Sequence, residues 1–134
     1  MSVTIEDNTN EFMQKLESGV RLALEFSVEQ IKSEVQRIRP PQVITGFFRA
    51  SMYADGQTLT ITGEGKNRVA TVSGKAKIKK RADIYTARLI EGADYGVWLE
   101  FKPFTHVGVL APMRKGAANA VPAINKIFEK FLTI

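Results

Sequence analysis

The sequence predicts an α+β domain in which a long N-terminal helix and a C-terminal helix pack on a small antiparallel β-sheet with an extended basic loop. Three observations support this. Apolar residues recur at helical spacing in the first third of the chain, the pattern changes to strict alternation at Thr58, and helical spacing returns after Pro112. A chain of 134 residues has the size of one domain, so we expect a single domain over residues 1–134.

The first predicted element is an amphipathic helix over about residues 8–39. Asn8 followed by Glu11 is a capping-box pattern, and Pro40 ends the helix because proline lacks the backbone donor and disfavours helical geometry in the residue before it. About 30 residues at about 1.5 Å each give a rod of about 45 Å. Because this exceeds the need of such a small core, we expect part of the helix to pack on another subunit. Its apolar stripe consists of Phe12, Leu16, Val20, Leu24, Ile31, Val35 and Ile38.

A β region is predicted over about residues 52–91. Residues 58–62 alternate between threonine and apolar residues, residues 68–73 are rich in strand formers, and residues 63–67 between them suit a hairpin loop. Residues 85–90 are predicted to add a third strand. The loop at 74–82 offers only Ile78 for burial, so we expect it to be mobile or protruding until a partner binds it.

Most of the positive charge belongs to this region. The net charge is +5, yet residues 64–81 carry seven basic residues and one acidic residue, a local net charge of +6, while the rest of the chain has 12 basic and 13 acidic residues. Such a local field can act on a polyanion or on an acidic protein partner. The candidate interface cations are Lys75, Lys77, Lys79, Lys80 and Arg81.

Two helices are predicted in the last third of the chain. A short one over about 93–101 places Tyr95, Trp98, Leu99 and Phe101 on one side. A final helix over about 112–132 begins at Pro112, which suits a first helical turn. Pro122 lies inside it and predicts a kink or two consecutive helices.

The composition excludes several classes of protein. The chain has no cysteine, which excludes disulfides, thiolate metal sites and cysteine nucleophiles. We find neither an apolar run near 18 residues nor a leader-like N-terminus, so we expect no membrane association and a cytoplasmic site of synthesis.

The catalytic alternatives are weak. His106 has no second histidine nearby to share a metal, and neither Ser51 nor Ser73 lies in a nucleophile-elbow sequence. Asp83 with Glu100 and Lys102 is reminiscent of metal-dependent nucleases, in which two carboxylates hold the ion and a lysine stabilises the developing charge. Helical spacing at residues 95–100 argues against the strand that such a site requires, and favours Glu100 as a structural or intersubunit ion-pair partner. We expect no catalytic residue, cofactor or metal.

Two segments carry a family resemblance. The first is residues 43–51, Val-Ile-Thr-Gly-Phe-Phe-Arg-Ala-Ser, and the second is residues 93–101, Ala-Asp-Tyr-Gly-Val-Trp-Leu-Glu-Phe, followed by Val-Leu-Ala-Pro-Met at 109–113. In this order, between a long helix and a final helix, they resemble the tail-completion or head-tail joining proteins of long-tailed phages. Lys102 departs from the family pattern, which has glycine there. The motif positions with an expected structural role are Thr45, Gly46, Phe48, Arg49, Ser51, Tyr95, Glu100, Phe101 and Pro112.

The resemblance implies a structural virion protein without catalytic residues. It would complete the tail end and join head to tail as one copy in a homo-oligomeric ring, a hexamer being one possible size. Its partners would be the head connector and the tail-tube or terminator proteins, with possible DNA contact, and it would lie in the neck of a virion assembled in the host cytoplasm. Two alternatives remain open: a small nucleic-acid-binding module that uses the basic loop at 75–81, and the metal-dependent nuclease.

Overall fold

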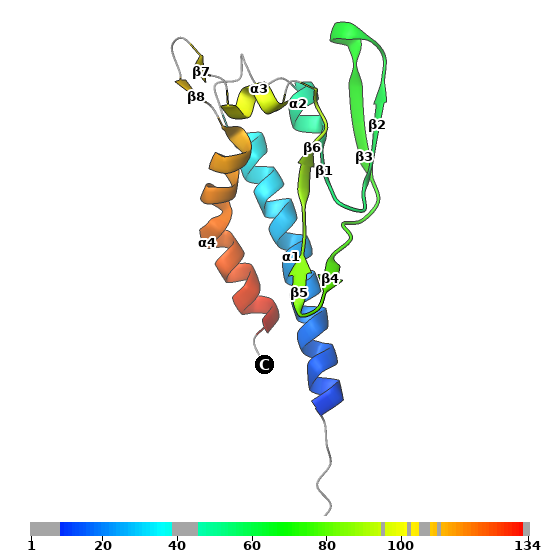
Figure 1. The fold of residues 1–134 in the computed structure, drawn as a ribbon, viewed down its shortest axis with the longest axis vertical. Coiled ribbons are helices and arrows are strands. Elements are labelled where there is room, and N and C mark those ends of the chain that lie inside the picture. The colour runs from blue at the N-terminus through cyan, green and yellow to red at the C-terminus, as the bar shows by residue number, and fades with distance from the viewer. Residues whose placement is uncertain are drawn as a thin grey trace, which may run out of the picture.

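The structure is a computed structural model that describes residues 9–38, 46–94, 96–101, 103–104, 108–109 and 111–132. Two long helices, α1 (Thr9–Arg37) and α4 (Pro112–Leu132), lie side by side (Figure 1). The strands within residues 52–91 lie on one side of α1, whereas the two short strands at 103–104 and 108–109 lie beside the start of α4. The short helices α2 (Gly46–Ala50) and α3 (Gly96–Phe101) cover the end where α1 finishes and α4 begins. Within these ranges, no helix has the length and apolar character to cross a membrane.

The strands form four antiparallel pairs. β1 (Met52–Ala54) pairs with β6 (Leu89–Glu91), β2 (Thr58–Thr62) with β3 (Val69–Ser73), β4 (Lys79–Arg81) with β5 (Ile84–Thr86), and β7 (Pro103–Phe104) with β8 (Gly108–Val109). The α+β class, the β region at 52–91 and the hairpin around residues 63–67 are therefore confirmed. The expectation of one small sheet with a third strand at 85–90 is wrong, because that stretch divides between β5 and β6, which pair with different strands.

The α1–α4 contact depends on glycine at both ends of the helix pair. A Cβ atom on Gly19 would lie 2.6 Å from the Phe131 carbonyl oxygen, and one on Gly116 would lie 2.8 Å from the Val35 backbone nitrogen and nearer still to the Val35 side chain. Only glycine permits so close an approach. Between these points the buried residues are Ala23, Ser27, Val28 and Ala120, three of which are small.

The largest buried cluster joins the C-terminal half of α1 to α2, β1 and the turn before α3. It consists of Val35, Phe48, Met52 and Ala93, with half-buried apolar neighbours around it. Phe48 is completely buried, so loss of its ring would cost about 3–5 kcal/mol. The neighbours are Ile31, Ile38, Phe47, Leu89 and Met113.

The predicted helix boundaries agree closely with the structure, except at α3 and Pro122. α3 begins at Gly96 instead of residue 93, because a turn precedes it in which the Gly96 N–H donates to the Ala93 carbonyl at 3.0 Å. α4 continues through Pro122, so the prediction of two consecutive helices is wrong. The carbonyl four residues before a helical proline loses its donor, and here Ala118 and Pro122 are both exposed, so water can satisfy that carbonyl.

Replacement of Gly116 with alanine should test the helix contact. Its Cβ would meet the Val35 side chain and backbone, and because the backbone cannot move aside cheaply, we expect a loss of about 1–3 kcal/mol in the free energy of unfolding. Gly46→Ala is the matched control, because no atom lies within 4 Å of its added Cβ. Urea denaturation of both variants is the measurement. Equal stability of the two variants would contradict the close-packing account.

A partly buried carboxyl group lies beside this core. Glu91 Oε1 accepts a hydrogen bond from the Ala93 N–H at 2.7 Å, whereas Oε2 is buried without a hydrogen-bond partner among the described residues. Burial raises the pKa of Glu91 to about 7, although the bond from Ala93 acts in the opposite direction. The folded state therefore holds this proton more tightly than the unfolded chain, in which the pKa is near 4.5.

This raised pKa predicts that stability falls as the pH rises from about 4.5 to about 7, since the folded protein binds the Glu91 proton and the unfolded chain releases it. Glu91→Gln keeps the acceptor for Ala93 and removes the charge. We expect its melting temperature to exceed that of the wild type at about pH 8 and the difference to shrink toward about pH 5. Glu64→Gln, in an exposed loop, is the control and should show no such trend. A pH-independent difference for Glu91→Gln would refute this assignment.

Candidate interaction surface

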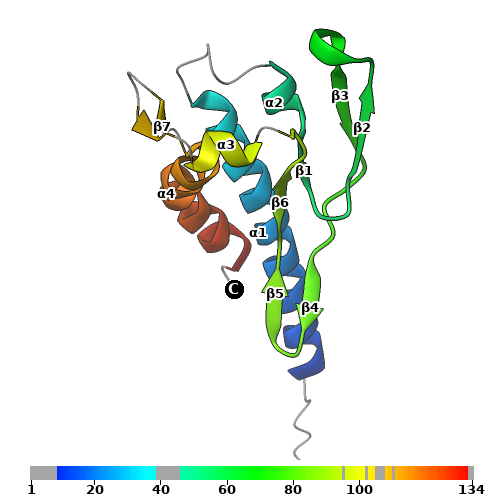
Figure 2. The ribbon, with the colours of Figure 1, turned by 45° about the horizontal axis from the view of Figure 1, so that its top comes forward.

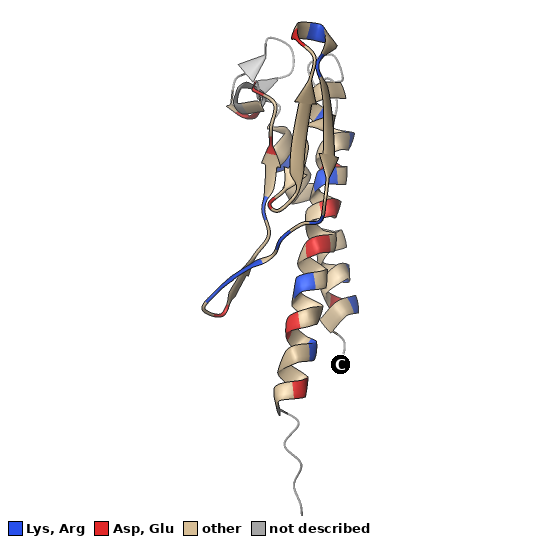
Figure 3. Ribbon diagram, turned by 90° about the vertical axis from the view of Figure 1, so that its right-hand side faces the viewer, with Lys and Arg blue, Asp and Glu red and all other residues tan. Residues whose placement is uncertain are grey.

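The basic segment folds as a hairpin that contacts the N-terminal half of α1 and diverges from the helix toward its tip (Figure 3). We call residues 75–86 the basic arm; it contains β4, a turn at residues 82–83 and β5. Figures 1 and 3 show the arm reaching toward the N-terminal end of α1, with its tip directed away from the strand pair β1–β6. The expectation of protrusion agrees with this shape, whereas the expectation of a loop without regular structure is wrong, because Lys80 pairs with Tyr85 in an antiparallel ladder.

The arm is anchored to the body at its base. Ile78 is buried, its carbonyl accepts a hydrogen bond from Arg21 Nη1 at 2.9 Å, and the Lys77 N–H donates to the Asp55 carbonyl at 2.6 Å. Ile78, the one residue of the predicted loop at 74–82 that was available for burial, is therefore buried against the body. We infer that this contact and the backbone bonds offset the low apolar content that led to the prediction of a mobile loop.

Two of the five candidate cations, Lys79 and Lys80, form ion pairs within the subunit. Lys79 Nζ lies 2.9 Å from Asp55 Oδ2, and the hydrogen bond from Lys79 is the main reason that the pKa of Asp55 is lowered. Lys80 Nζ lies 4.0 Å from Glu17 Oε2 and 5.3 Å from the centre of the Tyr85 ring. A hydrogen bond with Tyr85 and the charge of Glu17 raise the pKa of Lys80.

Arg21 completes this contact between the arm and α1. It forms an ion pair with Glu17 at 3.2 Å, and its guanidinium carbon lies 5.4 Å from the centre of the Tyr85 ring. Glu17 therefore pairs with two cations, Arg21 on α1 and Lys80 on the arm. Only the spacing of Glu17 and Arg21, four residues apart on a helix, was visible in the sequence; Asp55 and Tyr85 could not have been identified without the fold.

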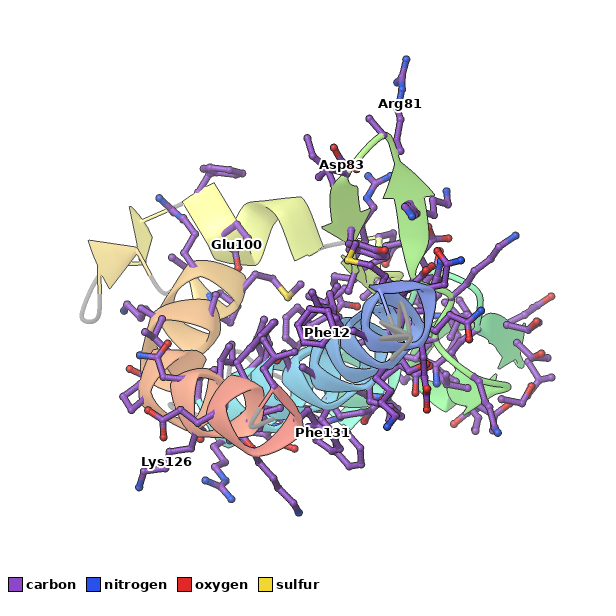
Figure 4. All side chains as sticks on the ribbon, turned by 90° about the horizontal axis from the view of Figure 1, so that it is seen from below. Phe12, Arg81, Asp83, Glu100, Lys126 and Phe131 are labelled. Atoms are coloured by element: carbon purple, nitrogen blue, oxygen red, sulfur yellow. The ribbon has the colours of Figure 1, made fainter. Side chains whose placement is uncertain are left out.

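The other three candidate cations face outward. Lys75, Lys77 and Arg81 are exposed, and within the described ranges no ion pair or side-chain hydrogen bond involves them. Figure 4 shows Arg81 at the tip of the arm, with its side chain directed away from both long helices. We call these three residues the outer cations. They are the part of the predicted basic site that is available to a second molecule.

An open groove and an exposed apolar end lie next to the arm. The groove, of about 370 Å³, runs between the arm and α1. Phe12 and Met13 are 45% and 54% exposed on α1, and Ile84 is 68% exposed on the arm. Of these three, only Met13 lines the groove, and an exposed apolar side chain beside an open groove is a candidate contact for a protein partner. The groove is lined by Met13, Leu16, Glu17, Val20, Lys80, Asp83 and Tyr85.

Glu100 does not join this surface. Its Oε1 accepts a hydrogen bond from the Met113 N–H in the first turn of α4, and its Oε2 lies 3.3 Å from Arg114 Nε. The Arg114 guanidinium in turn lies 5.0 Å from the centre of the exposed Phe101 ring. An acidic group is favourable at a helix N-terminus. The geometry therefore gives Glu100 an intrasubunit capping role, the structural alternative that its sequence position left open.

The nuclease arrangement is absent from the described residues. Asp83 is at the tip of the arm and Glu100 on α3, far apart along the long axis in Figure 1 and well separated in Figure 4. The described ranges contain no group of three or more histidine or acidic residues that could hold a metal ion. Lys102 and His106 lie outside the described residues.

The first motif segment surrounds the core cluster. Phe48 is buried in α2, the Ser51 hydroxyl donates to the Phe47 carbonyl at 2.6 Å, and Arg49 Nη2 donates to the Ile38 carbonyl at 3.4 Å. These contacts give the segment a structural role. Among the remaining motif positions, Pro112 is buried at the start of α4 and Gly46 begins α2, whereas Thr45 and Tyr95 lie outside the described residues.

Comparison of the chain with protein-family models, curated proteins and solved structures found no match in any of the three.

Proposed function

We propose that this chain is a structural protein of a phage neck, in which copies form a ring that completes the tail end and joins it to the head. Its partners would be further copies of itself, the head connector, and the tail-tube or terminator proteins. The virion, assembled in the host cytoplasm, would be its location. The proposal assigns no catalytic residue and no cofactor.

One observation carries the proposal: a single subunit presents two chemically different surfaces beside each other. The outer cations Lys75, Lys77 and Arg81 suit an acidic partner, and the exposed Phe12 and Met13 suit an apolar one. A ring of identical copies is built from one repeated contact between different patches, so the outer cations would meet an acidic patch of the next copy, and Phe12 and Met13 an apolar one. Charge pattern then selects the partner, while apolar burial supplies affinity. The sequence resemblance of residues 43–51, 93–101 and 109–113 supplies the biological setting.

The outer cations also support a second candidate function, the binding of DNA. Three lysine or arginine side chains on a protruding arm can each contact a phosphate and release a counterion. Binding of this kind would weaken steeply with salt, and loss of all three contacts would reduce the slope of log K against log salt by about 3. The same side chains therefore serve either function, and a single variant can separate the two.

The test replaces Lys75, Lys77 and Arg81 together with glutamine. Because exposed charges contribute little to stability, the melting temperature should stay near that of the wild type. If the arm docks on a neighbouring protein, phage carrying the variant should yield filled heads and free tails that do not join. If the arm contacts only DNA, necks should look normal, and the defect should appear in DNA retention or ejection.

The matched control removes three exposed cations outside the arm, Lys66, Lys126 and Lys130, and should assemble normally. A second comparison replaces Lys79 and Lys80, whose partners are within the subunit. Loss of these contacts should mainly loosen the arm, and faster amide exchange over residues 77–86 would show this. Infectious, fully joined particles from the triple variant of the outer cations would exclude both proposed roles for the arm.

A further inference from the structure

The outer edge of β2 is a row of backbone groups to which none of the described residues offers a partner. β2 pairs only with β3, and no other backbone hydrogen bond involves residues 58–62 in the described parts of the chain. In Figures 1 and 2 this hairpin lies away from the two long helices, with β2 on its outer side. A two-stranded hairpin is marginal in water, and an open edge is a template for another strand.

This edge lacks the residues that normally protect an edge strand. Proteins block such edges with charged side chains, proline or bulges. β4 has this protection, because all three of its residues are lysine or arginine. β2 reads Thr-Leu-Thr-Ile-Thr and contains neither a charge nor a proline, and four of its five residues are exposed. Ile61, an apolar residue, is 42% exposed.

The β2 sequence is complementary to itself in the antiparallel direction. If two copies pair with Thr60 opposite Thr60, then Thr58 faces Thr62, and Leu59 faces Ile61, in both halves of the contact. Threonine pairs then occupy one face and apolar pairs the other, and both kinds of cross-strand pair are favourable. No like charges meet, although the whole chain carries a net charge of +5.

We propose that β2 pairs with β2 of a second copy about a two-fold axis at Thr60, which creates a four-stranded sheet in the order β3, β2, β2, β3. The Leu59 side chain of each copy packs beside Gly92 of its own chain, and in the pair it would also cover Ile61 of the other copy. A two-fold contact closes after two copies, so it is distinct from the repeating contact of the proposed ring and goes beyond it. With only five residues in each strand, the dimer should be weak and depend on concentration.

Cysteine substitution gives a matched pair of probes, because the chain contains no cysteine of its own. Thr60 and Thr71 lie directly opposite each other on the exposed face of the same hairpin. In the proposed pair, two copies of Thr60→Cys meet at the axis within reach of a disulfide. Two copies of Thr71→Cys are three strand spacings apart, about 14 Å, which is beyond that reach.

Under mild oxidation of the full chain, Thr60→Cys should form a covalent dimer, and Thr71→Cys should form much less. Equal cross-linking of the two variants would indicate random collision and would overturn the proposal. In a mixture of the two variants, preferential linkage of a Thr60→Cys chain to a Thr71→Cys chain would indicate head-to-tail pairing of β2 with β3 and would also overturn it.

Sedimentation velocity tests the same contact without a covalent bond. The wild type should show a concentration-dependent monomer–dimer equilibrium. Thr60→Lys places two cations opposite each other at the axis. We therefore expect its dimer dissociation constant to be at least about tenfold higher than that of the wild type. Thr71→Lys adds the same charge to the same face of the hairpin and should dimerise like the wild type. A wild type that stays monomeric, or equal weakening by both substitutions, would refute the pairing whatever the outcome of the phage experiments.

Discussion

The close contact between α1 and α4 is the constraint on which the rest of the structure depends. Gly116 lets α4 reach the backbone of Val35, and Val35 is also part of the buried cluster with Phe48, Met52 and Ala93. The helix pair and the short elements at its upper end therefore share one core residue. At the other end, Gly19 meets the Phe131 carbonyl, which holds the two helices together near their exposed ends.

Away from the core, charged side chains hold the basic arm to the rest of the subunit. Ile78 is the only buried apolar residue of β4 and its approach, so the basic arm relies on Glu17 and Asp55 to receive Lys80 and Lys79. Exposed ion pairs are weak one by one. Here they act together with a buried side chain, two hydrogen bonds to the backbone and cations over the Tyr85 ring. The result divides the basic residues between those that hold the arm and the outer cations that are free to bind a partner.

The surfaces proposed for binding differ in chemistry, and the difference suggests different partners. The outer cations and the apolar end of α1 suit proteins with acidic and apolar patches. The β2 edge has no charge and offers backbone groups, so it suits another strand more than a side chain. These proposals can fail independently, because the edge contact concerns pairs of free subunits and the arm concerns assembly of the particle.

Periodicity in the sequence alone determined the α+β class, both long helices and the β2–β3 hairpin, because each of these elements has a complete local pattern of apolar residues. The basic candidate residues were also visible in the sequence, because they follow one another within a short stretch of the chain. Tertiary structure decided which strand pairs with which, since β5 and β6 are adjacent in the sequence yet belong to different pairs. It also decided which cations remain free and that Glu100 caps α4, because the partners of these side chains lie on elements distant in sequence. Contacts of that kind depend on the packing of the helices, which no local pattern of residues encodes.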